Sequence, residues 1–501
     1  MTSLSPLREY LLIAILSTTQ ALQEASLGIV IAALHPIGES FGVPNDSGQQ
    51  SWFAASYALT VGTFILPAGR WGDVYGYKSM LLIGWTWFAV WSVVTGVSVY
   101  SGEVIFFDVC RALQGIGPAL IIPNAVAIIG RMYPEESLRK NIVFGLYGSL
   151  APAGFVFGCL LGSLFGQLSW WPWAFWTLSF LCLVMAIATI FVVPASLSSR
   201  PDRHISAAEL DLIGTALSVT GLILVNFAWN QAYVVEWVVP YNGALLSIGI
   251  LLLLAFGWWE SRAEHPLIPA RYFNVEATLT LVVLCVGFAS FGLWNFYYFR
   301  FSQDVRGYSP LAVTAQNAPI IPSGALAAVC TGYLLNRFGA SFVLTYAMIA
   351  IAIGSILLAT APVDETYWAR TFVSMIVVPW GVDATFPAST ILLANAFPQE
   401  YQGSAASIVN TLANYSISLG LGFAGTVERN LNPDGTMLLK GYRGAFYLGI
   451  GLAVLGLVIA ASFWLSDLVN AKGRAKKDSS INTPESGPEK GQAVGRAGSD
   501  P

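Results

Sequence analysis

The chain contains the stretch GRWGDVYG at residues 69–76 and, 263 positions later, the stretch GYLLNRFG at residues 332–339. Both follow the pattern G-x-x-x-[D/N]-x-x-G, and each comes directly after an apolar segment long enough to cross a bilayer. Glycines let helix ends approach closely, and a carboxylate beside them can cap a neighbouring helix. Membrane proteins built from two rocking halves repeat such elements at equivalent positions. The two turns therefore predict two equivalent helical halves.

The composition places these halves in a membrane. Of the 501 residues, 55% are hydrophobic and 10% are charged, and the mean hydropathy is +0.64. A soluble domain carries about 25% charged residues. A chain this apolar has too few polar side chains to cover a surface in water, whereas a bilayer removes that requirement. We therefore expect an all-α membrane protein.

Segments of roughly 20 apolar residues mark the expected membrane spans. They begin near Leu11, Trp52, Ser79, Val104, Ile142, Ala174, Leu210, Gly243, Ala277, Val313, Ser341, Tyr367, Ser404 and Phe446. This reading predicts 14 transmembrane helices, arranged as two six-helix halves plus two extra helices. Most of the Lys and Arg residues in the short loops fall on the side of the two termini, so we expect that side to be cytoplasmic.

The same reading divides the chain into five segments. We expect a cytoplasmic N-terminus at 1–10, an N-terminal six-helix half at 11–195 and a linker with two extra transmembrane helices at 196–262. A C-terminal six-helix half at 263–467 and a disordered cytoplasmic tail at 468–501 complete the chain. The tail is predicted to be disordered because it is rich in Gly, Ser, Pro and charge.

The turn at 69–76 resembles the signature of the major facilitator superfamily. Val74 and Tyr77 stand where that family usually has basic residues, so this copy of the signature is degenerate. The resemblance implies a major facilitator fold and a conformational latch on the cytoplasmic side. The latch residues are Gly69, Asp73, Gly76 and Lys78 in the first copy and Asn336, Arg337 and Gly339 in the second.

Three further motifs narrow the resemblance. The stretch RALQGIGPA at 111–119 matches a pattern linked to proton coupling in the superfamily, and WWPWAFW at 170–176 is similar to an element of fourteen-span drug:proton antiporters. A small-residue stripe with a proline resembles the motif of the antiporter branch: Gly148, Pro152, Gly154, Gly158 and Gly162. Together they resemble the fungal fourteen-span drug:proton antiporter family. That family includes the aminotriazole-resistance and boron-export proteins and efflux pumps for secondary metabolites.

A few charged residues lie inside the expected spans, where they are costly and mark functional sites. Glu24 and Arg111 are expected at similar depth, and we predict that they form a proton-linked pair. The family's usual acid in the first helix aligns near Ser26 instead. Arg111 also has a structural interpretation, since Asp108 lies three residues earlier on the same helix face. Asp383 is a second proton site, a substrate contact or a hydrogen bonder between helices.

Other candidate residues are less closely tied to a motif. Gln114, Trp294 and Asn295 are candidate substrate contacts, although aromatic residues near an interface usually form a membrane belt. Asn45 begins an N-x-S sequon in an expected external loop and is a candidate glycosylation site. The five cysteines and three histidines form no ligand cluster, so we expect no metal site.

Several classes of function are not expected. The sequence lacks GxxxxGK[ST], GxSxG and HExxH, which argues against an ATP-driven pump and against an enzyme. The net charge of −4 gives no reason to expect nucleic acid. We expect a monomeric, multi-pass transporter of the plasma membrane that exchanges small organic molecules, such as drugs, toxins or secondary metabolites, for protons. No cofactor is expected beyond the proton as coupling ion. The alternative solute is small and inorganic, such as ammonium or borate.

Overall fold

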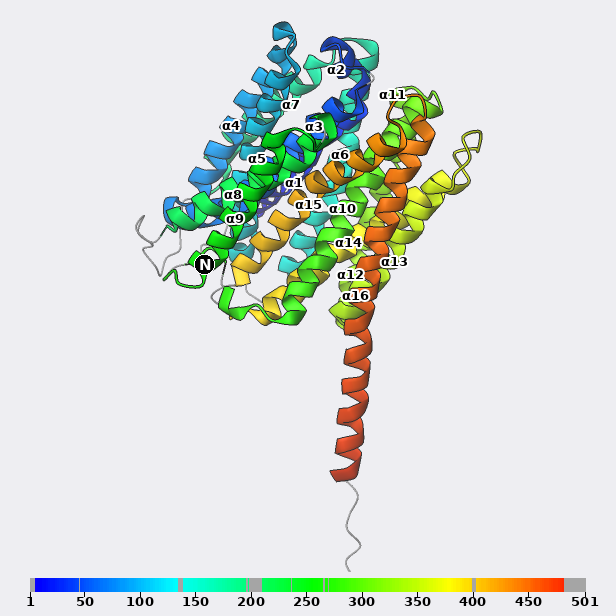
Figure 1. Cartoon of the computed structure of the whole chain (residues 1–501). Helices are drawn as coiled ribbons and strands as arrows, with labels where there is room; N and C mark the ends of the chain where they lie inside the picture. The colour runs from blue at the N-terminus through cyan, green and yellow to red at the C-terminus, as the bar shows by residue number, and fades with distance from the viewer. Residues whose placement is uncertain are drawn as a thin grey trace, which may run out of the picture.

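The computed structural model describes residues 5–481, apart from residues 45, 134–137, 195–196, 198–209, 236, 265, 269 and 399–401. Within this part of the chain the protein is helical and contains no strand, as an all-α membrane protein requires. The start of α1 (Pro6–Ala32) and the end of α16 (Leu438–Ile481) lie toward the end of the bundle opposite α2 (Leu34–Ser40) and α11 (Pro310–Asn317), as Figure 1 shows.

The helices form two groups joined by a pair. The first group comprises α1 (Pro6–Ala32), α2 (Leu34–Ser40), α3 (Ser47–Tyr75), α4 (Tyr77–Val97), η1 (Ser98–Ser101), α5 (Val104–Met132), α6 (Leu138–Leu168) and α7 (Pro172–Val192). The joining pair is α8 (Leu212–Val235) and α9 (Pro240–Glu260), followed by η4 (Ala270–Tyr272). The second group comprises α10 (Val275–Arg300), η5 (Phe301–Val305), α11 (Pro310–Asn317), α12 (Ile320–Phe338), α13 (Ala340–Ala359), α14 (Arg370–Ala396), α15 (Gln402–Leu431) and α16 (Leu438–Ile481).

The number of spans is close to the expected 14 but is not confirmed. Twelve of the described helical segments are long and apolar enough to cross a bilayer, and α1 with α2, bent by 66° at their junction, makes a thirteenth. The remaining long helix, α15, has 30 residues but is not among those segments. It packs against α3, α8, α10, α14 and α16, so protein rather than lipid surrounds much of its surface.

Glycines set the closest helix pair in the first group, α1 against α6. A Cβ atom added to Gly154, Gly158 or Gly162 would clash with the backbone of α1. A Cβ on Gly28 of α1 would lie 2.9 Å from the backbone nitrogen of Cys159 on α6. The two backbones are therefore in direct contact, which is how small residues bring membrane helices together when lipid supplies no hydrophobic driving force.

Polar contacts join the two groups at the end of the bundle where α2 and α11 lie (Figure 1). The hydroxyls of Ser163 on α6 and Thr314 on α11 are 2.7 Å apart. The Gln303 amide donates to the carbonyl of Ala32 at 3.3 Å. Toward the other end of α6, a Cβ on Gly145 or Gly148 would meet no atom within 4 Å. The groups are thus linked at the α2/α11 end, while this part of α6 faces open space.

The last helix is longer than the sequence suggested. α16 runs to Ile481, past Asp467 and into the segment expected to be a disordered tail. Ala, Lys and Arg dominate residues 471–477, and all three are good helix formers. The helix therefore continues beyond the bundle, as Figure 1 shows. Residues 482–501 lie outside the described part, and the other domain boundaries stay predictions.

Candidate functional site

Glu24 lies on α1 at the interface between the two groups of helices. It is half-buried, and the Gln23 amide donates to its Oε1 at 3.1 Å. The same amide donates to Oδ1 of Asn414 on α15 at 3.1 Å. The backbone carbonyl of Gln23 accepts a hydrogen bond from the Tyr57 hydroxyl at 2.9 Å. Gln23 therefore connects Glu24 to Asn414 of α15 and binds Tyr57 of α3.

Asp383 approaches the same region from α14, between two prolines of that helix. Its carboxyl is half-buried and forms no hydrogen bond or ion pair that the described residues record. A Cβ on Gly324 of α12 would lie 2.8 Å from Asp383 Oδ2 and 3.0 Å from Pro152 Cγ. Asp383 and Pro152 thus both lie beside Gly324. Asp383 is also close enough to Glu24 for an electrostatic interaction between the two carboxyls.

We call these two intramembrane acids the central pair: Glu24 from the first group and Asp383 from the second. Neither forms an ion pair with a basic side chain in the described part of the chain. Sequence reasoning identified both residues but did not pair them. The neighbouring Gln23 and Asn414 were missed, although each is a polar residue in an apolar segment.

Arg111 is completely buried on α5, with 0% of its surface exposed. Its Nε donates to the Phe53 carbonyl at 3.0 Å, and its Nη1 donates to Ser26 Oγ at 2.7 Å. Nη1 also donates to Gln114 Oε1. The guanidinium carbon lies 4.4 Å from the centre of the Tyr57 ring, a cation–π contact. All of these partners are uncharged.

Glu24 and Arg111 form no ion pair in this conformation, and the proton-linked pairing expected of them stays a prediction. Arg111 instead binds Ser26, the position where the family's usual first-helix acid aligns. Asp108 is close enough for an electrostatic interaction with Arg111, but its Oδ1 has no hydrogen-bond partner in the described residues. The part that Arg111 and Asp108 play in proton coupling stays a prediction.

Two of the three candidate substrate contacts are occupied by the protein itself. Gln114 binds Arg111 and donates to Ser92 Oγ at 2.7 Å. The Trp294 indole donates to Ser374 Oγ at 2.8 Å, and its ring stacks beside Tyr298. Asn295 differs, because it is 4% exposed and its Oδ1 has no partner among the described residues. Of these three candidates, only Asn295 has a side-chain oxygen without a hydrogen-bond partner among the described residues in this conformation.

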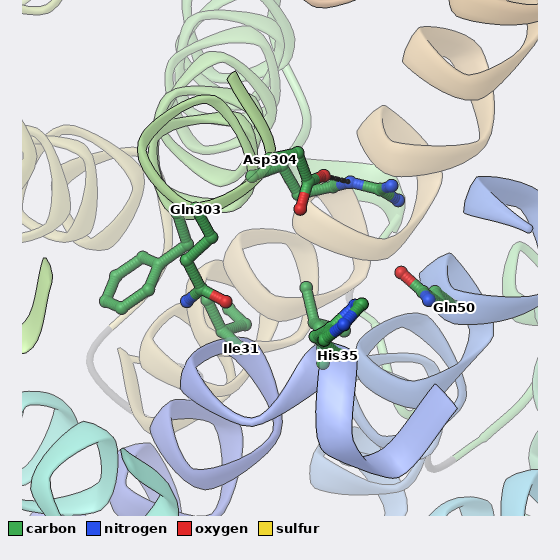
Figure 2. Close-up of a pocket in the computed structure, with 8 residues that line it drawn as sticks. Ile31, His35, Gln50, Gln303 and Asp304 are labelled. Atoms are coloured by element: carbon green, nitrogen blue, oxygen red, sulfur yellow. Dashed lines mark hydrogen bonds and ion pairs between the residues drawn. The ribbon is translucent and has the colours of Figure 1, made fainter. Parts of the chain in front are cut away.

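One small cavity lies between the groups at the α2/α11 end. A cavity of about 10 Å³ lies between the α1–α2 bend, α3 and the end of α10, which is room for about one water molecule. His35, Gln50, Gln303 and Asp304 line it, as Figure 2 shows. Asp304 Oδ2 accepts a hydrogen bond from Arg300 Nε at 3.2 Å. This cavity is therefore too small for an organic solute.

The first latch turn is held by contacts that its degenerate signature did not reveal. Gly76 has φ +89° and ψ 136°, a conformation that favours glycine. The Tyr77 hydroxyl donates to Asp73 Oδ1. The Lys78 ammonium donates to the Val193 carbonyl at 2.7 Å. Arg131 of α5 places its guanidinium 4.5 Å from the ring centre of Tyr77, one of the two positions where the family usually has a basic residue.

The second turn is more open. Gly339 has φ +83°, which favours glycine as at Gly76. Asn336 and Arg337 are exposed, and the Arg337 guanidinium lies 5.9 Å from the ring centre of Phe338. The latch role of both turns stays a prediction. The candidate glycosylation site Asn45 lies outside the described residues.

Comparison with known proteins confirms the resemblance. Residues 16–421 match the model of the Major Facilitator Superfamily. The chain is 49% identical over 474 residues to the low affinity ammonium transporter of Saccharomyces cerevisiae, covering 94% of this chain and 91% of that protein. It is 45% identical over 460 residues to the efflux pump terJ of Aspergillus terreus, covering 92% and 88% respectively.

The fold also matches solved transporters. The structure of a POT family transporter in complex with a thioalcohol-conjugated peptide aligns with a TM-score of 0.65 at 14% identity, covering 90% of this chain and 95% of that one. The relatives are transporters rather than enzymes, in agreement with the missing catalytic motifs. Because the family model and these relatives cover most of its length, the chain belongs to the major facilitator superfamily as a multi-pass membrane transporter.

Proposed function

We propose that this transporter is a proton-coupled antiporter that exports small organic molecules, such as drugs, toxins or secondary metabolites, across the plasma membrane. The observation that carries the proposal is the central pair, Glu24 and Asp383. Each acid comes from a different group of helices, and the two interact electrostatically without a described basic partner. A buried carboxyl without a counter-ion costs less free energy when it carries a proton. Rocking of the groups changes that environment and hence the affinity of the pair for protons.

The other polar residues have supporting roles in this mechanism. Gln23 links Glu24 to Asn414, so movement of α15 relative to α1 alters the hydrogen bond that Glu24 accepts. Arg111 anchors α5 to α1 and α3 through Ser26 and Phe53. The relative terJ, an efflux pump, supports export. The proton is the coupling ion, and the protein works as a monomer without a cofactor.

A second candidate solute is ammonium. The 49% identical relative from Saccharomyces cerevisiae is a low affinity ammonium transporter. Two acids in the same region of the interface also suit a small cation, because their combined negative charge favours a positive ligand. Transport in this case need not involve an organic molecule, so the two candidates are separable by experiment.

The test uses the full chain in proteoliposomes with an imposed pH gradient. Flux of a panel of organic compounds and of labelled methylammonium is measured with and without a protonophore. We expect gradient-driven organic flux that the protonophore abolishes, and Glu24→Gln or Asp383→Asn to remove the pH dependence. Glu103→Gln, a change at an exposed acid outside the helices, is the matched control and should behave as wild type.

Two outcomes decide against the proposal. Organic flux that persists unchanged with the protonophore contradicts proton coupling. Methylammonium flux without any organic flux favours the second candidate.

A further inference from the structure

Two acids lie where the first joining helix begins and the second one ends, away from the central pair. Asp211 precedes the first residue of α8, and Glu260 is the last residue of α9. These helices pack on each other, so the start of one lies beside the end of the other. Glu260 is only 2% exposed. A carboxyl buried this deeply needs a charged or hydrogen-bonding partner for each oxygen.

In each carboxyl one oxygen is satisfied and the other is not. Asp211 Oδ1 accepts from the Gly214 backbone N–H at 2.7 Å, an N-cap of α8, and from the Trp259 indole at 2.8 Å. Glu260 Oε2 accepts from the Ile268 backbone N–H at 3.0 Å. The other two oxygens, Asp211 Oδ2 and Glu260 Oε1, are buried without a hydrogen-bond partner in the described residues.

The two unsatisfied oxygens converge on one place. A Cβ on Gly214 would lie 2.7 Å from Glu260 Oε1 and closer still to Asp211 Oδ2. The carboxyls are within hydrogen-bonding reach of each other. Two ionised carboxylates at this separation repel, whereas a single proton between them turns the repulsion into a strong hydrogen bond.

Nearby charged groups are engaged elsewhere. The Arg262 guanidinium lies 4.3 Å from the ring centre of Trp258, and Arg271 Nη2 lies 3.5 Å from the carbonyl of Ser261. Glu264 is exposed, and residue 265 lies outside the described part. Arg70 and Asp73, on the neighbouring α3, bind the Pro266 carbonyl and the Tyr77 hydroxyl respectively. No described cation forms an ion pair with Asp211 or Glu260.

We propose that Asp211 and Glu260 form a proton-binding site, in which one proton is shared between Asp211 Oδ2 and Glu260 Oε1. Because the unpartnered oxygen of Glu260 is aimed at that of Asp211, both are satisfied when the proton is present. The site ties the start of α8 to the end of α9. It also positions residues 266–268, whose Pro266 carbonyl accepts from Arg70 of the first latch turn at 2.9 Å. This inference does not depend on which solute is transported.

Binding of this proton makes the stability of the folded chain depend on pH, and the direction of the dependence can be worked out. At acidic pH the folded and unfolded chains both hold the proton, so the shared hydrogen bond is fully stabilising. As the pH rises, the unfolded chain ionises both acids while the folded chain retains one proton. The folded state therefore binds more protons, and its stability falls with rising pH.

The test measures the thermal unfolding midpoint of the full chain in detergent by tryptophan fluorescence between acidic and alkaline pH. Glu260→Gln keeps a neutral donor toward Asp211 and should flatten the fall of the midpoint on the alkaline side. Asp211→Asn should flatten it equally. Glu264→Gln, a change at the exposed neighbouring acid, should leave the slope of wild type unchanged.

A spectroscopic measurement observes the proton directly. The infrared difference spectrum of wild type minus Glu260→Gln at neutral pH should contain the C=O band of a protonated carboxyl, shifted in D₂O. Absence of that band together with an unchanged pH slope in both variants would overturn the proposal. A midpoint raised by Na⁺ or Ca²⁺ in wild type but not in Glu260→Gln, without the band, would equally overturn it and assign the site to a metal cation.

Discussion

Replacing Gly158 with alanine tests the contact on which the first group of helices depends. The new Cβ would lie 2.5 Å from the Cα of Ala25 and closer still to its carbonyl oxygen. Ordinary Cβ contacts begin near 3.4 Å, so α1 and α6 must separate locally by about 0.9 Å or more. A gap of this size forfeits a quarter to a half of the dispersion attraction between the facing atoms.

Overpacking of this kind costs about 1–3 kcal/mol. The change also perturbs Glu24, which directly precedes Ala25 in the sequence, so we expect reduced transport together with reduced stability. Gly148→Ala is the matched control on the same helix, because its Cβ would meet nothing within 4 Å. In that open position alanine should stabilise the helix by about 0.5–1 kcal/mol.

The assay follows unfolding of the purified protein with a thiol-reactive fluorophore, since Cys110, Cys159 and Cys182 are buried and become reactive on unfolding. We expect a lower midpoint for Gly158→Ala than for wild type and an equal or higher midpoint for Gly148→Ala. Equal midpoints for the two variants would refute the inference that the α1 backbone occupies the space beside Gly158.

Three further predictions follow from single contacts. Arg111→Lys loses the donors to the Phe53 and Ser26 carbonyls. This change should destabilise the protein by about 2–4 kcal/mol and abolish transport. A lysine variant with wild-type unfolding and flux would contradict this prediction. Trp294→Phe loses one hydrogen bond and should cost about 1 kcal/mol in thermal unfolding while sparing flux, whereas a selective loss of flux would assign Trp294 to the substrate path. Gly339→Ala places a side chain at φ +83°. The resulting strain should reduce the free energy of unfolding by about 1–3 kcal/mol and so lower the unfolding midpoint. An unchanged midpoint would argue against strain at this turn.

Local features of the chain predicted the class of fold and the family. Span length and low charge are properties of each segment, because every backbone group in a bilayer must be satisfied within its own helix. The small-residue stripe of Gly154, Gly158 and Gly162 likewise predicted a close helix contact, which the structure places against α1. The count of 14 spans is not confirmed, because α15, which corresponds to the span expected near Ser404, is not among the segments apolar enough to cross a bilayer, although it packs against five other helices.

The sequence by itself determined that this protein is an all-α membrane transporter with a few charged residues inside its spans. Only the tertiary structure decided which charges lie near one another: Glu24 is near enough to Asp383 for an electrostatic interaction and forms no ion pair with Arg111, and Asp211 lies beside Glu260 across two helices. The physical reason is that periodicity and motifs describe one helix at a time. A pairing between helices depends on their rotation and separation, which the packing of the whole bundle sets.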